Sequence, residues 1–277
     1  MTKPAPSSAI EAVQRAQYDS QGLLVLPGVL SRSAELRAVV DEIEELGRTF
    51  RADFALSDSA ALAMFTDKAR GNFYRALRYL PSLAALGGCE YFRGLCQSLG
   101  LRFPALMRSY NIRMDTPGAD EHLFHWHQDV TYLLGSLNSV TLWLPLGPAD
   151  TEHGSVAYIP SSHNALRPFE FTSAEAREKT AQHSPRDIRL CSEPQEEPRI
   201  VTAGAGDLVV FSQFLVHRST PNRSARCRWT VQLRYSDLCE PQFRDAGFPF
   251  GDMTTVARTD YLTCTQPIRS SAIHDQF

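Results

Sequence analysis

The chain has 277 residues, of which 43% are hydrophobic and 21% are charged, a balance typical of a globular protein with a full apolar core. Its formal net charge is −3 at pH 7, so no overall positive field argues for binding to nucleic acid or to an anionic membrane. No apolar run approaches the ~20 residues of a membrane-spanning helix, and the first residues lack the layout of a signal peptide. Six scattered cysteines without a C-x-x-C pair favour reduced thiols, so we expect a cytoplasmic protein with neither nucleic acid nor membrane as a partner.

The first third of the chain is predicted to be mainly helical. Apolar residues recur at helical spacing in residues 8–20 and again in residues 31–46, where we expect Ser31 to cap the helix. Residues 22–27 lie between these two stretches as a short apolar run ended by a Pro-Gly pair, which is typical of a strand. A third helix is expected at residues 81–99, where a glycine follows.

Residues 48–79 combine arginines with aromatic residues, and two interpretations fit this pattern. The arginines can form the solvated face of the helical layer, which we favour. They can instead belong to a lid that presents cations to an anionic substrate. The arginines concerned are Arg48, Arg51, Arg70, Arg75 and Arg78.

From Leu106 to about Leu238 the pattern changes to short strand-like segments separated by turn residues. Many short strands with few helices between them predict a mainly β fold with flanking helices, namely a double-stranded β-helix (a jelly roll or cupin-like barrel). Residues 169–198 are polar and contain prolines, so we expect an insertion there with one short helix. The expected strands are residues 107–114, 139–146, 155–159, 199–202, 207–216 and 229–237.

These segments predict a single domain that spans residues 1–277. Its parts are an N-terminal helical layer at 1–105, a metal-binding barrel core at 106–238 and a loop-like C-terminal tail at 239–277. No repeat of 20–50 residues is visible, which argues against a solenoid or a propeller.

The candidate metal site is the segment His-Trp-His-Gln-Asp at residues 125–129. In an extended chain, residues two apart point to the same face, so His127 and Asp129 project together while Gln128 points away. An imidazole and a carboxylate on one face are two corners of a two-histidine, one-carboxylate site for Fe(II). His217, at the end of a later apolar run, is the candidate for the second imidazole. Three protein ligands leave open positions for a bidentate co-substrate and O2.

The last strand-like segment alternates between an apolar and a polar face. The apolar face, suited to packing, consists of Trp229, Val231, Leu233 and Tyr235. We expect the polar face to line the mouth of the barrel, and it consists of Arg228, Thr230, Gln232 and Arg234. A guanidinium presents a planar fork to a carboxylate, so Arg228 is the candidate for the distal carboxylate of a keto acid, with a hydroxyl from Ser219. The alternative is that Arg228 is a surface cation beside Arg223 and Arg226.

Motifs in a consistent order run from residue 127 to residue 228. They are H-Q-D at 127–129 followed by Tyr132, W-L-P-L at 143–146, E-H-G-S-V at 152–156, I-P-S-S-H at 159–163, G-D-L-V-V-F at 206–211, H-R-S at 217–219, and Arg228. Together they resemble the phytanoyl-CoA dioxygenase family of Fe(II)/2-oxoglutarate-dependent oxygenases, over about residues 106–235. One departure is His153, where the family usually has Asn, and we expect it to alter a turn only.

The resemblance implies a double-stranded β-helix with helices packed on one sheet. It implies that His127, Asp129 and His217 bind iron and that Arg228 and Ser219 contact 2-oxoglutarate. The expected enzyme uses Fe(II), 2-oxoglutarate and O2 to hydroxylate a C–H bond of a small polar or anionic metabolite, with release of succinate and CO2. The carboxylate of Asp129 favours hydroxylation, because related halogenases lack it.

Two alternatives stay open at this point. The same iron centre could perform desaturation, cyclisation or epimerisation in natural-product biosynthesis, or the chain could be a non-catalytic, cupin-like protein that binds a small molecule. The sequence also leaves the substrate and the oligomeric state open. The candidate contacts of 2-oxoglutarate are Arg228, Ser219, Asn111 and Thr141. The candidate contacts of the substrate are Arg113, Gln128, Tyr132, Trp143 and Arg234.

Overall fold

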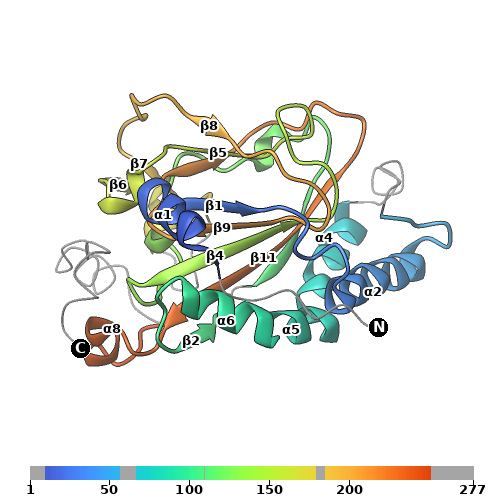
Figure 1. Ribbon diagram of the computed structural model, residues 1–277. Coiled ribbons are helices and arrows are strands. Elements are labelled where there is room, and N and C mark those ends of the chain that lie inside the picture. Colours follow the sequence, from blue (N-terminus) through green and yellow to red (C-terminus); the bar gives the residue numbers. More distant parts are fainter. Residues whose placement is uncertain (1–9, 57–66, 109, 179–184, 251–277) are drawn as a thin grey trace, which may run out of the picture.

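The structure is a computed structural model, and it describes residues 10–56, 67–108, 110–178 and 185–250. Its largest element is an antiparallel sheet of six strands in the order β1-β9-β4-β11-β2, with β3 paired to β11 (Figure 1). The strands are β1 (Leu23–Leu26), β2 (Pro104–Leu106), β3 (Asn111–Asp115), β4 (Ser139–Pro145), β9 (Leu208–Ser212) and β11 (Arg228–Asp237). The protein is therefore mostly antiparallel sheet with flanking helices, as expected.

A second, three-stranded antiparallel sheet lies over one face of the large sheet (Figure 1). Its strands, in the order β10-β5-β8, are β5 (Val156–Tyr158), β8 (Arg199–Ile200) and β10 (His217–Ser219). Apolar side chains fill part of the space between the sheets, with Trp143 and Phe211 from the large sheet against Val156 and Tyr158 from the small one. The remaining space between the sheets holds the polar site described below.

Helices cover the other face of the large sheet (Figure 1). They are α1 (Ala12–Gln21), α2 (Ala34–Phe50), α4 (Asp67–Ala76), α5 (Pro81–Gly87) and α6 (Glu90–Ser98). Successive side chains of β11 point alternately to the face covered by the helices and to the face that lies under the second sheet. Its apolar side chains belong to the core under these helices, which confirms the prediction for Trp229, Val231, Leu233 and Tyr235.

Two predicted helix boundaries are wrong. Ser33, not Ser31, caps α2, and its Oγ accepts a hydrogen bond of 3.1 Å from the backbone N–H of Leu36. The single helix expected at residues 81–99 is two helices, because the chain breaks at Gly88 and Cys89 adopts an extended conformation. The sequence Gly87-Gly88 favours this break, since glycine is a poor helix former.

The polar insertion contains the expected short helix, α7 (Ala174–Glu178), but also a hairpin of β6 (Phe169–Phe171) and β7 (Ile188–Leu190) that was not expected.

The C-terminal tail is not all loop. Helix α8 (Pro241–Asp245) begins after Glu240, whose carboxylate accepts hydrogen bonds from two backbone N–H groups of its first turn. Residues 251–277 lie outside the described residues. Short 3-10 turns occur at Leu77–Tyr79, Asp120–His122, Asp129–Thr131 and Ser162–Asn164.

The aromatic residues of the arginine-rich segment belong to the helical layer. The rings of Phe54 and Phe73 pack edge-on against Trp229, on the apolar face of β11. Arg48 is at the protein surface, where it pairs with Glu44 one helical turn earlier. This placement supports the solvated-face interpretation for the described residues. Residues 57–66 lie outside the described residues. Each helix in the described ranges is too short or too polar to cross a membrane.

The packing of β11 against the helices gives a stability prediction. Leu233 is completely buried in the core between sheet and helices, so Leu233→Ala should lower the free energy of unfolding by about 2–5 kcal/mol. Val13 is 70% exposed, and Val13→Ala should change it by no more than about 0.5 kcal/mol. Urea unfolding of both variants measures the difference, and equal stabilities would mean that this face of β11 is not core.

Candidate metal centre and active site

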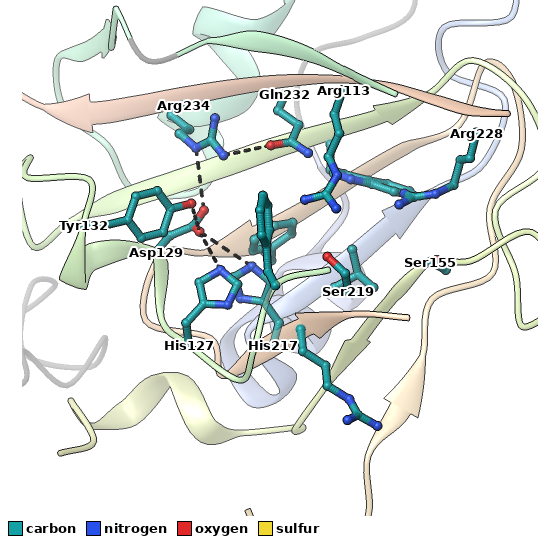
Figure 2. Close-up of a pocket in the computed structure, with 15 residues that line it drawn as sticks. Arg113, His127, Asp129, Tyr132, Ser155, His217, Ser219, Arg228, Gln232 and Arg234 are labelled. Atoms are coloured by element: carbon teal, nitrogen blue, oxygen red, sulfur yellow. Dashed lines mark hydrogen bonds and ion pairs between the residues drawn. The ribbon is translucent and has the colours of Figure 1, made fainter. Parts of the chain in front are cut away.

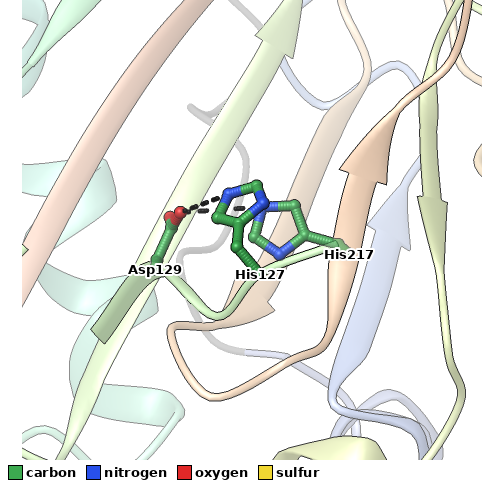
Figure 3. A group of neighbouring side chains, drawn as sticks. All are labelled: His127, Asp129 and His217. Atoms are coloured by element: carbon green, nitrogen blue, oxygen red, sulfur yellow. Dashed lines mark ion pairs between the residues drawn. The ribbon is translucent and has the colours of Figure 1, made fainter. Parts of the chain in front are cut away.

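Three side chains from two distant segments of the chain meet between the sheets (Figure 3). The Nε2 atoms of His127 and His217 lie 3.5 and 3.6 Å from Oδ1 of Asp129, and the candidate ligand atoms all lie within 4.8 Å of one another. All three side chains are buried. Neighbouring ligand atoms on an ion with bonds of about 2.1 Å lie about 3 Å apart, so one ion could contact all three after a small contraction.

The backbone fixes this meeting point. His127 and His217 form an antiparallel bridge in which each backbone N–H donates to the other residue's carbonyl at 3.0 Å. The expected strand end is only partly formed, because Asp129 opens a 3-10 turn. The predicted alternation nevertheless holds, since His127 and Asp129 face the same point and Gln128 does not.

Hydrogen bonds also set the tautomers of the two imidazoles. Nδ1 of His127 lies 2.7 Å from the carbonyl of His125, and Nδ1 of His217 lies 2.9 Å from the carbonyl of Leu215. A carbonyl only accepts, so each Nδ1 must carry the hydrogen, and in the neutral form of the ring the lone pair then lies on Nε2. Metal-binding histidines are oriented by this kind of contact. Burial, together with the nearby His127 ring, lowers the pKa of His217 to about 4, so this imidazole is neutral near pH 7.

Asp129 is held as a carboxylate deep inside the protein. Burial by itself would raise the pKa of Asp129, but the interactions with His127 and His217 and the positive charge of Arg234 outweigh burial and hold that pKa far below its usual value. The site thus presents two imidazoles and one anionic oxygen, which is the ligand set of a mononuclear Fe(II) centre.

Three expected contacts of substrate or co-substrate also surround Asp129, and Figure 2 shows two of them, Tyr132 and Arg234. The Tyr132 hydroxyl donates to Oδ1 at 2.5 Å, and the Thr141 hydroxyl donates to Oδ2 at 2.8 Å. Arg234 Nε lies 3.7 Å from Oδ2. Thr141 does not line the pocket, and its hydroxyl hydrogen is already used by the carboxylate, so the structure gives its prediction as a 2-oxoglutarate contact no support.

A pocket with about 400 Å³ of space, part of it open to solvent, adjoins the three candidate ligands. Beyond the three ligands, the sequence-predicted residues that line it are Arg113, Tyr132, Trp143, Ser219, Arg228 and Arg234. No described arginine of the segment 48–79 lines the pocket, so the lid interpretation has no support there.

Arg228 occupies one side of the pocket and is not the surface cation of the alternative interpretation (Figure 2). It is 4% exposed, and its Nη2 donates to Asp115 at 2.7 Å. Arg113 holds the same carboxylate through Nε and Nη2, at 2.6 to 2.9 Å. Burial alone would raise the pKa of Asp115, but the two guanidiniums outweigh burial and hold it below its usual value. Asp115 thus fixes both arginines while Nε of Arg228 keeps no hydrogen-bond partner.

Gln128 does not line the pocket, so the structure gives its prediction as a substrate contact no support. It is completely buried away from the pocket. Its Nε2 donates to the carbonyls of Ala165 and Phe214, and its Oε1 accepts from the backbone N–H of Arg167. Asn111, on β3 opposite Gln232, does not line the pocket either. Gln128 is a structural link between the metal segment and two loops.

This role of Gln128 gives a second stability prediction. Gln128→Ala should lower the free energy of unfolding by at least about 2 kcal/mol, since three backbone groups lose their partner and each unsatisfied buried group costs about 1–3 kcal/mol. Gln195→Ala, at an exposed position with one hydrogen bond to a nearby carbonyl, is the matched control and should be nearly neutral. Denaturant unfolding compares the two, and an unaffected Gln128→Ala would show that the three bonds contribute nothing.

Gln232 lines the pocket, as expected for the polar face of β11 that it shares with Arg228 and Arg234, whereas Thr230 of that face does not. Arg234 Nη2 donates to Gln232 Oε1 at 2.8 Å, and since arginine only donates, the amide nitrogen of Gln232 is left free.

Other pocket residues were not singled out as contacts. Phe124 has no local signal in the sequence, whereas the others lie within the family motifs, and they are Ser155, Val156, Phe211 and Arg218.

Two stacked sheets with two imidazoles and a carboxylate between them define a metal-dependent enzyme of the two-histidine, one-carboxylate class. The sequence profile of the phytanoyl-CoA dioxygenase (PhyH) family matches residues 18–230. The chain therefore belongs to the phytanoyl-CoA dioxygenase family, and it is an Fe(II)- and 2-oxoglutarate-dependent dioxygenase. Its cofactor is iron, and its co-substrates are 2-oxoglutarate and O2.

Among curated relatives, L-proline trans-4-hydroxylase of Streptomyces griseoviridis is 23% identical over 89% of this chain and 95% of its own length. Phytanoyl-CoA dioxygenase domain-containing protein 1 of Bos taurus is 28% identical over 78% of this chain and 86% of its own length. The fold is shared with EvdO2 from Micromonospora carbonacea var. aurantiaca complexed with 2-oxoglutarate (TM-score 0.56, 16% identity, 84% of this chain and 93% of that one). It is also shared with EctD from S. alaskensis with 2-oxoglutarate and 5-hydroxyectoine (TM-score 0.56, 17% identity, 86% and 80%).

Proposed function

We propose that this dioxygenase hydroxylates a C–H bond of a small anionic metabolite, with Fe(II) held by His127, Asp129 and His217. The observation that supports this most strongly is the convergence of two imidazole Nε2 atoms and one buried carboxylate oxygen within 4.8 Å, with each Nδ1 held by a backbone carbonyl. When bound, iron with O2 supplies the oxidising chemistry, in which 2-oxoglutarate is converted to succinate and CO2 and a substrate C–H bond is oxidised.

We further propose that Arg228 binds the distal carboxylate of 2-oxoglutarate. Its guanidinium is buried, is fixed by Asp115 and keeps an unpartnered Nε, so it can add charge-assisted hydrogen bonds to a carboxylate without reorganising. Ser219 lines the same pocket two residues after His217. Trp143 lies beside Arg228, whose Cζ is 5.5 Å from the Trp143 ring centroid.

Charge in the pocket supports an anionic substrate. Three buried guanidiniums, of Arg113, Arg228 and Arg234, face two buried carboxylates, of Asp115 and Asp129. Fe(II) adds two positive charges and 2-oxoglutarate adds two negative charges, so one positive charge remains without a counter-charge. A buried charge without a partner is costly, which favours a substrate that brings a carboxylate or similar group.

The side chains around the metal segment would orient the substrate and exclude water. The Arg113 guanidinium lies 3.8 Å over the Phe124 ring, and its Nη2 also donates to the carbonyl of His122 at 3.2 Å. These contacts hold residues 122–124 against the pocket. The free amide nitrogen of Gln232 and the guanidinium of Arg113 present donors to the pocket, which suits an acceptor-rich group.

The finer description of the fold is part of the same proposal. We infer that the two sheets are those of a double-stranded β-helix, that residues 1–277 act as one domain, and that the enzyme works in the cytoplasm on a small molecule without nucleic-acid or membrane partners. Free thiols at all five cysteines in the described ranges support a reducing compartment. The N-terminal layer is not only helical, since β1 and β2 belong to the large sheet.

The function is tested with purified protein, Fe(II) and 2-oxoglutarate. Anaerobic addition of 2-oxoglutarate to the Fe(II)-loaded protein should produce a charge-transfer absorption band, and a panel of small carboxylic acids should then be screened for O2-dependent succinate release. Each acid is paired with its primary amide, and we expect the acids to be preferred. Absence of the band would reject the assignment of the site, and preference for the amides would reject the anionic substrate.

A different oxidative outcome at the same iron is the second candidate, because the ligands do not distinguish the reactions. Product mass separates them. Hydroxylation adds one oxygen, desaturation or ring closure removes two hydrogens, and epimerisation leaves the mass unchanged.

A further inference from the structure

The two oxygens of the Asp129 carboxylate have different surroundings. Oδ1 faces the Nε2 atoms of both histidines, at 3.5 and 3.6 Å. Oδ2 instead accepts the hydroxyl hydrogen of Thr141 at 2.8 Å and lies 3.7 Å from Nε of Arg234. Both oxygens contact protein groups, since Oδ1 also accepts the Tyr132 hydroxyl hydrogen at 2.5 Å, but only Oδ1 faces the two imidazoles.

The sheet explains why Thr141 and Arg234 act on the same oxygen. They are direct partners in the register of β4 and β11, and directly opposite side chains on one sheet face lie about 5 Å apart. Both are buried, Thr141 at 1% and Arg234 at 5% exposure. A cross-strand pair on the large sheet thus contacts Oδ2, and Figure 2 shows the Arg234 member beside Asp129.

We propose that Thr141, together with Arg234, is a positioning pair that keeps Oδ2 off the iron, so that Asp129 binds through Oδ1 alone. This inference rests on the proposed function. If Oδ2 could swing to the metal, the carboxylate would occupy two coordination positions. Two imidazoles and a two-point carboxylate would leave two positions of an octahedron, too few for a bidentate co-substrate and O2 together. The pair thereby preserves the open positions that the reaction needs.

The test compares three substitutions at buried threonines. Thr141→Val removes the hydroxyl while conserving shape, and Thr141→Ser keeps the hydroxyl. The matched control is Thr230→Val on β11, because the Thr230 hydroxyl is buried without a hydrogen-bond partner and does not line the pocket. Circular dichroism confirms that each variant is folded, and Thr141→Ala replaces Thr141→Val if the latter is not.

Two measurements are made on each variant, namely anaerobic Fe(II) titration and the visible absorption of the Co(II)-loaded protein, whose intensity reports coordination number. Partners of metal ligands contribute about 10–100-fold to metal affinity, so Thr141→Val should change the Fe(II) dissociation constant by at least about 10-fold and should alter the Co(II) spectrum. Thr141→Ser and Thr230→Val should resemble the parent protein in both.

The proposal is overturned if Thr141→Val matches the parent in affinity and spectrum, or if Thr230→Val changes them equally. A change in affinity with an unchanged Co(II) spectrum would also overturn it, because the coordination mode would then be independent of Thr141. Failure of the parent protein to bind Fe(II) would contradict the proposed function itself, and the two failures are thus distinguishable.

Discussion

Asp129→Ala should abolish 2-oxoglutarate turnover. This change removes the only carboxylate among the three candidate ligands and leaves two imidazoles. Loss of a mere hydrogen-bond partner of a metal ligand costs about 10–100-fold, so loss of the ligand should reduce Fe(II)-dependent succinate formation by more than about 100-fold. His127→Ala should have the same effect, because His127 supplies one of the two Nε2 atoms. Succinate release under saturating Fe(II) measures both.

The matched control for this prediction is Asp245→Ala. Asp245 is exposed on α8 and only pairs with the neighbouring Arg244, so its removal should leave turnover within about twofold of the parent. Normal turnover in both Asp129→Ala and His127→Ala would show that the chemistry occurs elsewhere. Unfolding of the variants is checked separately by circular dichroism.

Arg228→Ala should raise the KM for 2-oxoglutarate strongly. A hydrogen bond to a charged group contributes about 1.5–3 kcal/mol, and a loss of that size corresponds to an increase of about 10–150-fold. The carboxylate of Asp115 stays paired with Arg113 in this variant, so the protein should remain folded. Steady-state rates at varied 2-oxoglutarate concentration measure the effect.

Arg226→Ala is the control for this second prediction. Arg226 is of the same type and only two residues away, but its side chain is exposed, so the KM for 2-oxoglutarate should not change. Equal effects of Arg226→Ala and Arg228→Ala would indicate a general influence of positive charge. An unchanged KM in Arg228→Ala would remove Arg228 from the co-substrate site.

The local alternation of side chains was enough to predict a large part of the site. His127 and Asp129 face one point, and Arg228 and Arg234 face the pocket, because residues two apart share a face. His217 was a candidate from its place at the end of an apolar run, and the family resemblance supported it, but no local pattern states which later segment pairs with residue 127. That bridge is a tertiary contact between distant parts of the chain.

The errors have physical causes that sequence periodicity does not report. Gln128 is polar and adjacent to two candidate ligands, yet its amide is consumed by three backbone groups from other loops. Thr141 lies on the pocket-facing side of β4, but the cross-strand partner Arg234 and the carboxylate of Asp129 determine what its hydroxyl contacts. The hairpin of β6 and β7 pairs two strands of only three residues, F-E-F and I-R-L, which are too short to stand out within a polar segment.

The iron position itself provides the most direct test. A crystal structure of the protein grown anaerobically with Fe(II) and 2-oxoglutarate, with anomalous data collected at the iron edge, would locate the metal. We expect one anomalous peak within about 2.2 Å of His127 Nε2, Asp129 Oδ1 and His217 Nε2. An iron bound by other side chains, or a fully loaded crystal in which either Nε2 points away from the metal, would contradict the account.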